Sequence, residues 1–556
     1  ARTATNGSTS GRGSCCSDTG PMTSRIWRVL RAGIPLGFLG VFFVWPVAAI
    51  IGRSLSAGAL HDVFADSGLR HVAWFTLWQA VVATGLTLAV GLPGAYVVGR
   101  YEFPGRRLFR ALVTVPFVLP TVVVATAFLV LLRPGGALSF LGWQRGVAPM
   151  MVAEVFFNVA VVVRVVGGFW SNLDPRRTDA ARVLGASRWR AFREVTLPLL
   201  GPPIAAAASI VFLFTFTAFG VVLLLADPAH ATLEVEIYRQ AVQLFDLPIA
   251  AALAFVQMVA VIALLLTLSR MQERRAVTQR LVATRDAARR PRGGERWVVG
   301  SVLGVTTLFL GGPLVVLAVE SLRVGGAWSP AAYRALGSAS TDTLFVPASD
   351  ALVNSLGFAA LAASIAVVVG GLASVVIASR PGRATRAMDT LLMLPLGTSA
   401  VTVGFGFLVA LDRWPLDLRA KTILVPIAQA VVAIPFVIRA VVPALRSIDP
   451  RLRDAAAVLG AAPARVWREV DLPIALRAFS VGFGFAIAVS LGEFGATLFV
   501  ARPDSPTIPI AISRFLARPG ALNVGQAMAM STILMMVTGA VVLAIEHVRV
   551  RQLGEL

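Results

Sequence analysis

The sequence predicts an all-α polytopic membrane protein with about 12 transmembrane helices, arranged as two parallel six-helix repeats. Hydrophobic residues make up 57% of the 556-residue chain and charged residues only 14%, whereas a soluble domain carries roughly 25% charged residues. About twelve stretches reach the ~20 apolar residues that a helix needs to cross a bilayer. A charged segment of the first half also recurs in the second half, 275 residues later.

The apolar stretches form two sets of six, separated by a polar linker. In the first half they lie at 32–52, 73–99, 111–132, 147–169, 202–226 and 249–269. In the second half they lie at 297–320, 352–378, 388–411, 422–445, 478–500 and 524–546. The predicted organisation is an N-terminal tail (1–31), a first repeat (32–269), a basic cytoplasmic linker (270–296), a second repeat (297–546) and a C-terminal tail (547–556). Residues 1–21 precede Met22 and are treated as a candidate translation artefact.

The distribution of positive charge predicts the orientation in the membrane. The net charge is +21, and most Lys and Arg fall in the loops and tails that share one side with both termini. Cytoplasmic loops carry such an excess. We therefore expect a multi-pass membrane protein with both termini in the cytoplasm. The basic linker is interpreted as a solvated loop beside anionic lipid headgroups, and no nucleic-acid partner is expected.

The repeated charged segment has the pattern of a short helical hairpin. The first hairpin, DPRRTDAARVLGASRWRAFREVTLPLL (174–200), and the second, DPRLRDAAAVLGAAPARVWREVDLPIA (449–475), are identical at 16 of 27 positions. Asp174 is placed to cap a first helix, Gly185 to end it in the left-handed conformation, and Leu197-Pro198 to break a second helix before the next span. Because each repeat has an even number of spans, both hairpins are expected on the cytoplasmic face.

The hairpins have two interpretations, anchoring to the membrane surface and contact with a partner protein. One copy alone favours an amphipathic hairpin that lies on the membrane surface with its tryptophans at the interface. Surface anchoring gives no reason for both copies to keep the same glycine, the same Leu-Pro and the same spacing. The two copies therefore favour a pair of contacts with a shared partner.

Both hairpins resemble the EAA motif of the membrane subunits of ATP-binding cassette importers, with Asp in place of Glu and Val in place of Ile. In that family the hairpin holds the coupling helix, which sits in a cleft of the ATPase subunit. The resemblance implies ATPase-coupling roles for Asp179, Ala180, Ala181, Gly185, Arg190, Leu197, Pro198, Asp454, Ala455, Ala456, Gly460, Arg465, Leu472 and Pro473.

Two such hairpins in one chain resemble a fused permease of a type I bacterial importer, because an ATPase dimer has two clefts. The segments HVAWFTLWQA (71–80), FPGR (103–106), TLEVEIYRQAV (232–242) and VSLGEFGATLF (489–499) are most similar to thiamine and ferric-iron permeases. The resemblance implies import of thiamine, its phosphates or ferric iron. A sulfate or molybdate permease is the alternative, because a similar GEFG segment occurs there.

The same resemblance implies the partners. They are an ATP-binding cassette ATPase homodimer at the cytoplasmic face, an extracytoplasmic solute-binding protein and the lipid bilayer. The outer loops 227–248 and 501–523 are expected to meet the binding protein.

The chain is expected to be a non-catalytic subunit with no cofactor of its own. A phosphate loop needs a lysine beside its glycines, and the only lysine is Lys421, so ATP and Mg are expected on the partner ATPase. Cys15, Cys16 and four scattered histidines predict neither a metal site nor a catalytic triad. An ion-coupled secondary transporter is the competing class, although the buried charges of such a relay are sparse here.

Polar residues inside spans are costly and are therefore candidates for the substrate pathway. Glu493 is the first candidate, and its equivalent in the first repeat is Ala218. A cargo contact and a helix-packing or gating role are the two interpretations. Glu154, Asn158 and Gln429, which aligns with Glu154, form a second candidate set, with hydrogen bonding between helices as the alternative.

Overall fold

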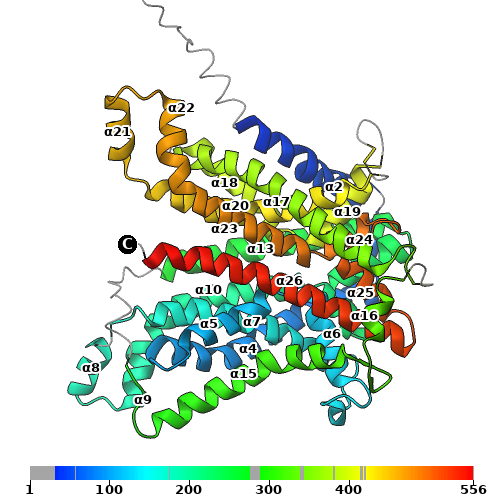
Figure 1. Ribbon diagram of the computed structural model, residues 1–556, viewed down its shortest axis with the longest axis horizontal. Helices are drawn as coiled ribbons and strands as arrows, with labels where there is room; N and C mark the ends of the chain where they lie inside the picture. Colours follow the sequence, from blue (N-terminus) through cyan, green and yellow to red (C-terminus); the bar gives the residue numbers. More distant parts are fainter. Residues whose placement is uncertain are drawn as a thin grey trace, which may run out of the picture.

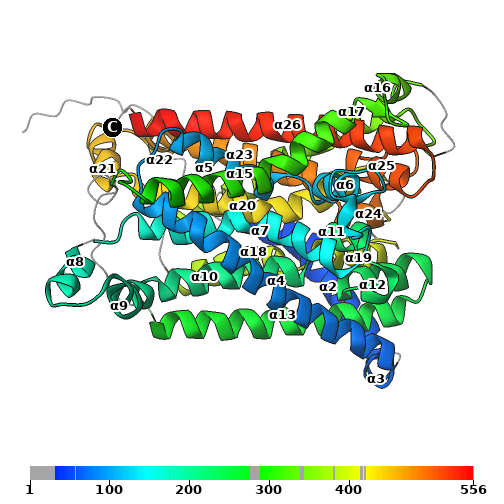
Figure 2. The same ribbon diagram turned by 90° about the horizontal axis from the view of Figure 1, so that it is seen from below.

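The computed structural model describes residues 32–56, 58–174, 176–275, 289–338, 343–379, 382–412, 417–418 and 421–554. The expectations for the N-terminal tail, with Met22, Cys15 and Cys16, and for the centre of the linker lie outside these residues. Long helices run side by side through the molecule (Figure 1, Figure 2). The only strands in the described part are β1 (Arg323–Val324) and β2 (Ala327–Trp328), which pair antiparallel.

The other elements follow in chain order. Up to residue 275 they are η1 (Gly40–Val44), α2 (Trp45–Ser56), α3 (Ala59–Ala65), α4 (Ser67–Arg100), α5 (Arg106–Val118), α6 (Thr121–Leu132), η2 (Ser139–Leu141), α7 (Val147–Trp170), α8 (Arg176–Val183), α9 (Arg188–Ala191), η3 (Phe192–Thr196), α10 (Leu197–Phe216), α11 (Gly220–Leu225), η4 (Pro228–His230), α12 (Leu233–Tyr238), η5 (Arg239–Gln243) and α13 (Leu247–Arg275). From residue 295 they are α15 (Glu295–Glu320), α16 (Ala331–Ala335), α17 (Ala348–Ser379), α18 (Arg383–Gly397), α19 (Ala400–Ala410), α20 (Leu424–Ser447), α21 (Pro450–Val458), α22 (Pro463–Val466), η6 (Trp467–Asp471), α23 (Leu472–Gly492), α24 (Gly495–Val500), α25 (Ile508–Leu516) and α26 (Ala521–Gly554).

The described helices confirm the polytopic all-α prediction. Ten of them are long and apolar enough to cross a bilayer, and the number rises to 12 if each of two bent helix pairs crosses as one span. Each of these helices satisfies its own backbone hydrogen bonds, as a membrane span must. Their apolar side chains fill the interior of the molecule. The helix α4 shows how the sequence starts such a span, since the Asp66 carboxylate accepts hydrogen bonds from the amides of Gly68 and Leu69.

Two predicted straight spans are instead sharply bent, at equivalent places in the two repeats. The stretch 111–132 is the pair α5 and α6, bent by 100°, and 388–411 is the pair α18 and α19, bent by 98°. In the first pair, Pro120 keeps Leu119 in an extended conformation and so ends α5. In the second pair, the Ser399 hydroxyl accepts a 3.0 Å hydrogen bond from the Val401 amide and starts a new helix.

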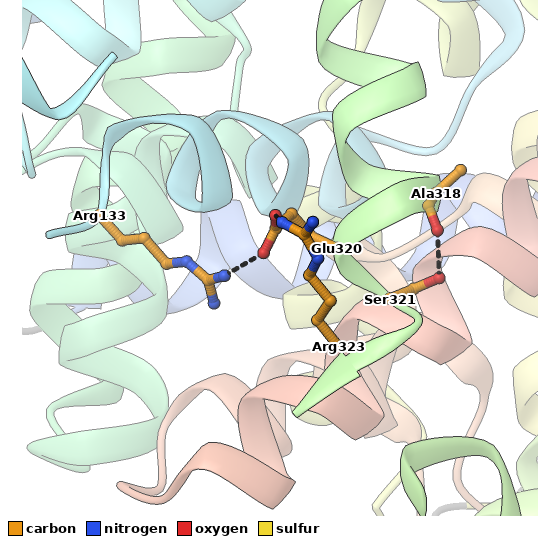
Figure 3. A network of polar contacts seen from close by, with 5 residues as sticks. All are labelled: Arg133, Ala318, Glu320, Ser321 and Arg323. Carbon is orange, nitrogen blue, oxygen red and sulfur yellow. Dashed lines mark hydrogen bonds and ion pairs between the residues drawn. The ribbon is translucent and has the colours of Figure 1, made fainter. Parts of the chain in front are cut away.

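The two repeats interleave. The first long helix of each packs on the bent pair of the other, because α2 lies against α19 and α15 lies against α6. Arg133, at the end of α6, binds Glu320, at the end of α15, with 2.5 Å between Nη2 and Oε2, and Arg323 binds the same carboxylate at 2.9 Å (Figure 3). Each repeat therefore depends on the other for part of its packing.

The two hairpins project from the same end of the molecule, here named the hairpin end. The helices α8 and α9 of the first hairpin and α21 and α22 of the second stand apart from each other there (Figure 1). The C-terminal part of α26 also lies at the hairpin end. The short helices α16, α24 and α25 lie at the other end, here named the opposite end (Figure 1, Figure 2).

Candidate functional site

Each hairpin begins with the predicted helix cap. The amide of Arg176 donates a 3.0 Å hydrogen bond to Oδ1 of Asp174, and the amide of Arg451 donates a 2.9 Å bond to Oδ1 of Asp449. These bonds satisfy amides that have no partner inside the helix. The capping role predicted for the two aspartates is confirmed.

The turn of each hairpin needs its glycine. Gly185 has a φ of 90°, in the left-handed region, and the amide of Ala186 donates a 3.1 Å bond back to the carbonyl of Ala181. This bond spans five residues and closes the helix end only if the residue between is left-handed. Gly460 repeats the geometry with a φ of 82°. The predicted left-handed turn is confirmed, and the alanine at the base of the motif supplies the carbonyl that closes it.

The predicted break at Leu-Pro is wrong. The chain passes from α9 through the π-helical turn η3 into α10, which begins at Leu197, without leaving helical structure. Pro198 is the second residue of α10 but lies inside this continuous helical run, where its missing N–H leaves a carbonyl of the preceding turn without that donor. The π-helical turn η3, in which the Leu197 amide bonds to the Phe192 carbonyl, accommodates the proline. The second hairpin has the same π-helical turn, η6, before Leu472. Such turns often mark functional sites, and here each lies where a hairpin joins the next span.

The tip of each hairpin exposes two large apolar side chains. Val183 and Leu184 are 87% and 88% exposed, and Val458 and Leu459 are both 87% exposed. An apolar cluster at a projecting tip is typical of a surface that docks on a partner. The repeated Val-Leu-Gly of the two copies is the signal in the sequence that could have identified these tips. The acidic and alanine residues of the motif, such as Asp179 and Ala180, also face outward.

Charged side chains on the second helix of each hairpin form equivalent pairs. Arg190 binds Glu194 with 3.1 Å between Nε and Oε1, and Arg465 binds Glu469 with 3.0 Å between the same atoms. Exposed ion pairs at this spacing contribute little to stability because solvent screens them. Their main consequence is that the two arginines are held in the same orientation on both hairpins.

The stem of the two hairpins is built differently. In the first, the hydroxyls of Thr178 and Thr196 lie 3.3 Å apart and join α8 to η3. The equivalent residues of the second are Arg453 and Asp471, whose Nε and Oδ1 atoms lie 2.7 Å apart. The same mechanical link is therefore a pair of hydroxyls in one hairpin and an ion pair in the other.

Asp471→Thr is expected to lower the free energy of unfolding by about 1–3 kcal/mol, because it removes the acceptor of the Arg453 guanidinium at a partly buried site. The double variant Arg453→Thr with Asp471→Thr reproduces the stem of the first hairpin and should recover most of that loss. Melting temperatures of the purified protein in detergent measure both effects. A single variant as stable as the unsubstituted protein would show that the ion pair does not hold the stem.

Glu493 caps a helix. Its carboxylate accepts hydrogen bonds from the amides of Ala496 at 2.7 Å and Thr497 at 2.9 Å, and also from the Thr497 hydroxyl. The side chain is buried at the break between α23 and α24. These contacts support the packing interpretation of Glu493 over a direct cargo contact.

The second candidate set does not form one site. Glu154 lies in α7, whose neighbouring side chains belong to one buried apolar cluster, and Gln429 lies in α20, whose neighbouring side chains belong mainly to another. Asn158 donates a hydrogen bond to the backbone carbonyl of Glu154, not to its carboxylate. Neither carboxylate oxygen of Glu154 has a hydrogen-bond partner within the described residues. The three residues therefore lie in two separate places, and their role in a substrate pathway stays a prediction.

A buried carboxylate that the sequence analysis missed joins the two repeats. Glu234, in α12 of the first repeat, accepts a 2.6 Å hydrogen bond from the Ser399 hydroxyl at the bend of the second repeat and another bond from Gln257. Burial raises the pKa of Glu234 to about 7, although both hydrogen bonds act in the opposite direction. Repetition gave no signal for this residue, because its equivalent is Pro509.

Two hollows open at the opposite end. One of about 200 Å³ is lined by His71, Trp74, Phe75, Trp78, Val147 and His230. The other, of about 480 Å³, lies on the second repeat and includes Phe407, Asp412, Leu424, Phe499, Ala501 and Arg502 in its lining. His71 and His230 thus come together, yet within the described ranges no group of three or more His, Cys, Asp or Glu side chains is placed to hold a metal ion.

Comparison with known proteins gives matches to both halves of the chain. The family model described as "Binding-protein-dependent transport system inner membrane component" matches residues 91–281 and again 366–552. The thiamine transport system permease protein ThiP of Brucella abortus (strain 2308) is 26% identical over 535 residues, covering 92% of this chain and 94% of that protein. The sulfate transport system permease protein CysT of Escherichia coli (strain K12) is 31% identical over 261 residues, covering 44% of this chain and 92% of that protein.

A solved structure is also similar to half of the chain. It is a crystal structure of a bacterial alginate ABC transporter in complex with an alginate pentasaccharide-bound periplasmic protein. One of its chains is 19% identical, with a TM-score of 0.39, covering 46% of this chain and 98% of that chain.

Proposed function

Because the chain belongs to the family of binding-protein-dependent transport system inner membrane components, we propose that it is the fused permease subunit of an importer for thiamine or its phosphates. The observation that carries the cargo assignment is the match to a thiamine permease along 92% of the chain. The sulfate permease matches only 44% of it. Both copies of the family match lie in one polypeptide, which agrees with a permease that needs no second membrane subunit.

The buried charges support a cationic cargo. Within the described residues the buried carboxylates are Glu154, Glu234, Glu236, Asp471 and Glu493, and no arginine or lysine is buried. Glu493 caps α24, and Asp471 and Glu236 pair with Arg453 and Arg239, which leaves Glu154 and Glu234 as the candidate acidic contacts for a cargo. A path for an oxyanion is expected to present positive groups or free amide donors, whereas acidic and aromatic surroundings favour the positively charged thiazolium ring of thiamine. Sulfate remains the second candidate, on the strength of its 31% identical relative.

The hairpins are the proposed contacts with the energy source. We assign both tips to an ATPase homodimer that holds ATP and Mg, one hairpin in each of its two clefts. The exposed Val183-Leu184 and Val458-Leu459 pairs provide apolar docking surfaces at matched positions. The π-helical joints η3 and η6 would transmit movement of the tips to α10 and α23. On this assignment the hairpin end and both termini face the cytoplasm, and a solute-binding protein docks at the opposite end, on the loops at 227–248 and 501–523.

The experiment that tests the cargo assignment measures ATP hydrolysis. The chain is reconstituted in liposomes with the ATPase and the binding protein encoded beside it, and thiamine, thiamine phosphates, ferric iron and sulfate are added separately. We expect stimulation by thiamine or its phosphates, and only when the binding protein is present. Stimulation by sulfate alone would replace the cargo assignment, and an ATPase that does not associate with the chain would favour an ion-coupled secondary transporter.

A further inference from the structure

Phe219 and Phe494 stack on each other across the two repeats. Their ring centroids lie 5.6 Å apart, the ring planes are inclined by 29°, and both side chains are buried. The two residues are equivalent, because Phe494 follows Phe219 by the repeat spacing of 275. Equivalent residues that touch must lie beside the axis that relates the repeats. The stack therefore marks the line between the repeats along which a shared path would run.

A row of aromatic rings connects this stack to the opposite end. The ring of Tyr238 lies 5.7 Å from that of Phe219, and the ring of Phe499 lies 5.7 Å from that of Tyr238. Phe499 in turn lines the hollow of about 480 Å³. Phe219 and Tyr238 belong to the first repeat and Phe494 and Phe499 to the second, so two of the three contacts, Phe219–Phe494 and Tyr238–Phe499, join the two halves of the molecule. Aromatic faces attract flat cationic rings through stacking and cation–π contacts.

The stack is tied to the two bends described above. Gly220 follows Phe219 at the start of α11, and a Cβ atom there would collide with the Thr121 hydroxyl, just after the bend of the first repeat. On the second repeat, the Glu493 carboxylate holds the start of α24 beside Phe494. The hydrogen bond from Ser399 to Glu234 joins the other bend to the first repeat. A movement of the bent pairs would therefore move the two rings.

We propose that the Phe219–Phe494 stack is the gate of the translocation path, closed in this structure, and that the cargo passes between the repeats when the two rings separate. The inference rests on the proposed importer function and specifies the residues that block the path. The closed stack coexists with hairpins that stand apart at the hairpin end (Figure 1). An ATPase dimer that draws the hairpins together would favour separated rings, because the spacing of the hairpins and the stacking of the rings would belong to the same two-state equilibrium.

Cross-linking tests the gate without any cargo. Phe219→Cys and Phe494→Cys are introduced together into a chain whose Cys15 and Cys16 are replaced by serine, and the complex with its ATPase is treated with a short bifunctional thiol reagent. We expect efficient cross-linking without nucleotide and a decrease of about fivefold or more when the ATPase is trapped with ATP and orthovanadate, as ordinary coupling between sites allows. Cross-linked protein should lose uptake, and a cleavable reagent should restore it on reduction.

A matched control uses Tyr96→Cys with Trp170→Cys. These rings lie 5.2 Å apart, but both belong to unbroken helices of the first repeat, α4 and α7, so their cross-linking should not respond to nucleotide. If Phe219→Cys with Phe494→Cys fails to fold, Tyr238→Cys with Phe499→Cys reports on the same interface. Equal cross-linking in both nucleotide states, with the control pair behaving as stated, would overturn the gate. A responsive pair together with no thiamine-stimulated ATP hydrolysis would instead retain the gate and reject the cargo.

Discussion

Replacing Gly185 and Gly460 together by valine is expected to reduce nucleotide-driven uptake at least tenfold while the amount of inserted protein stays unchanged. Both glycines have left-handed backbones, with φ of 90° and 82°, and open space lies where a side chain would be added. The effect is therefore backbone strain and not a clash. A left-handed residue with a side chain costs roughly 1–2 kcal/mol, more when it is β-branched. Two strained turns would displace both tips, and each 1.4 kcal/mol corresponds to about a tenfold change in docking.

The matched control is Gly142→Val. Gly142 also has a left-handed backbone, with φ of 68° and open space around it, but it lies in the loop before α7 and not in a hairpin. The Gly142→Val variant has the same kind of backbone strain and leaves the proposed ATPase contact unchanged. Uptake into vesicles and the quantity of protein in the membrane are measured for both variants. Normal uptake by the double hairpin variant would reject the coupling assignment of the hairpins.

Glu493→Ala is expected to lower stability by about 3 kcal/mol or more, because two backbone amides and one hydroxyl lose their acceptor at a buried site. The break between α23 and α24 would then lack its cap, and the second repeat would unfold at a lower temperature. Thermal unfolding of the detergent-solubilised protein without cargo measures this loss directly. If the variant keeps its melting temperature and loses only uptake, the carboxylate contacts the cargo and does not serve mainly as a cap.

Glu154→Gln is the control for that experiment. Glu154 is equally buried, but its carboxylate oxygens have no hydrogen-bond partner within the described residues. The amide has nearly the same shape and carries no charge to bury, so its melting temperature should equal or exceed that of the unsubstituted protein. It also gives the first repeat the residue that the second already has at Gln429. A lower melting temperature for Glu493→Ala but not for Glu154→Gln would show that the Glu493 carboxylate caps a helix and that the Glu154 carboxylate does not.

The fold could be predicted from local signals. Apolar stretches of sufficient length predicted the spans, and a repeated segment predicted two similar halves. The bends were missed because hydropathy predicts which stretches lie in the membrane and does not predict the direction of the helix axis. Pro120 marks the first bend in the sequence. The equivalent position in the second repeat is Ser399, whose hydroxyl caps α19, so no proline indicates the second bend. The Leu197-Pro198 pair misled in the other direction, because the chain accommodates the proline with the π-helical turn η3 and stays helical.

The candidate site was predictable where repetition and local chemistry agree. The Asp174 cap and the Gly185 turn follow from neighbouring residues alone, and the structure has both. Contacts between the repeats were not predictable in this way. Glu234 has no counterpart in the second repeat, and Phe219 and Phe494, although aligned in sequence, show their stacking only when the two repeats are assembled.

Uptake of radiolabelled thiamine by proteoliposomes decides whether this chain imports thiamine at the expense of ATP. The vesicles contain this chain with its ATPase, and the binding protein is present outside. We expect accumulation that requires both ATP inside the vesicles and the binding protein, and that excess unlabelled thiamine abolishes while sulfate does not. Uptake that continues without ATP would reject the ATP-driven importer, and accumulation of sulfate but not of thiamine would reject the cargo.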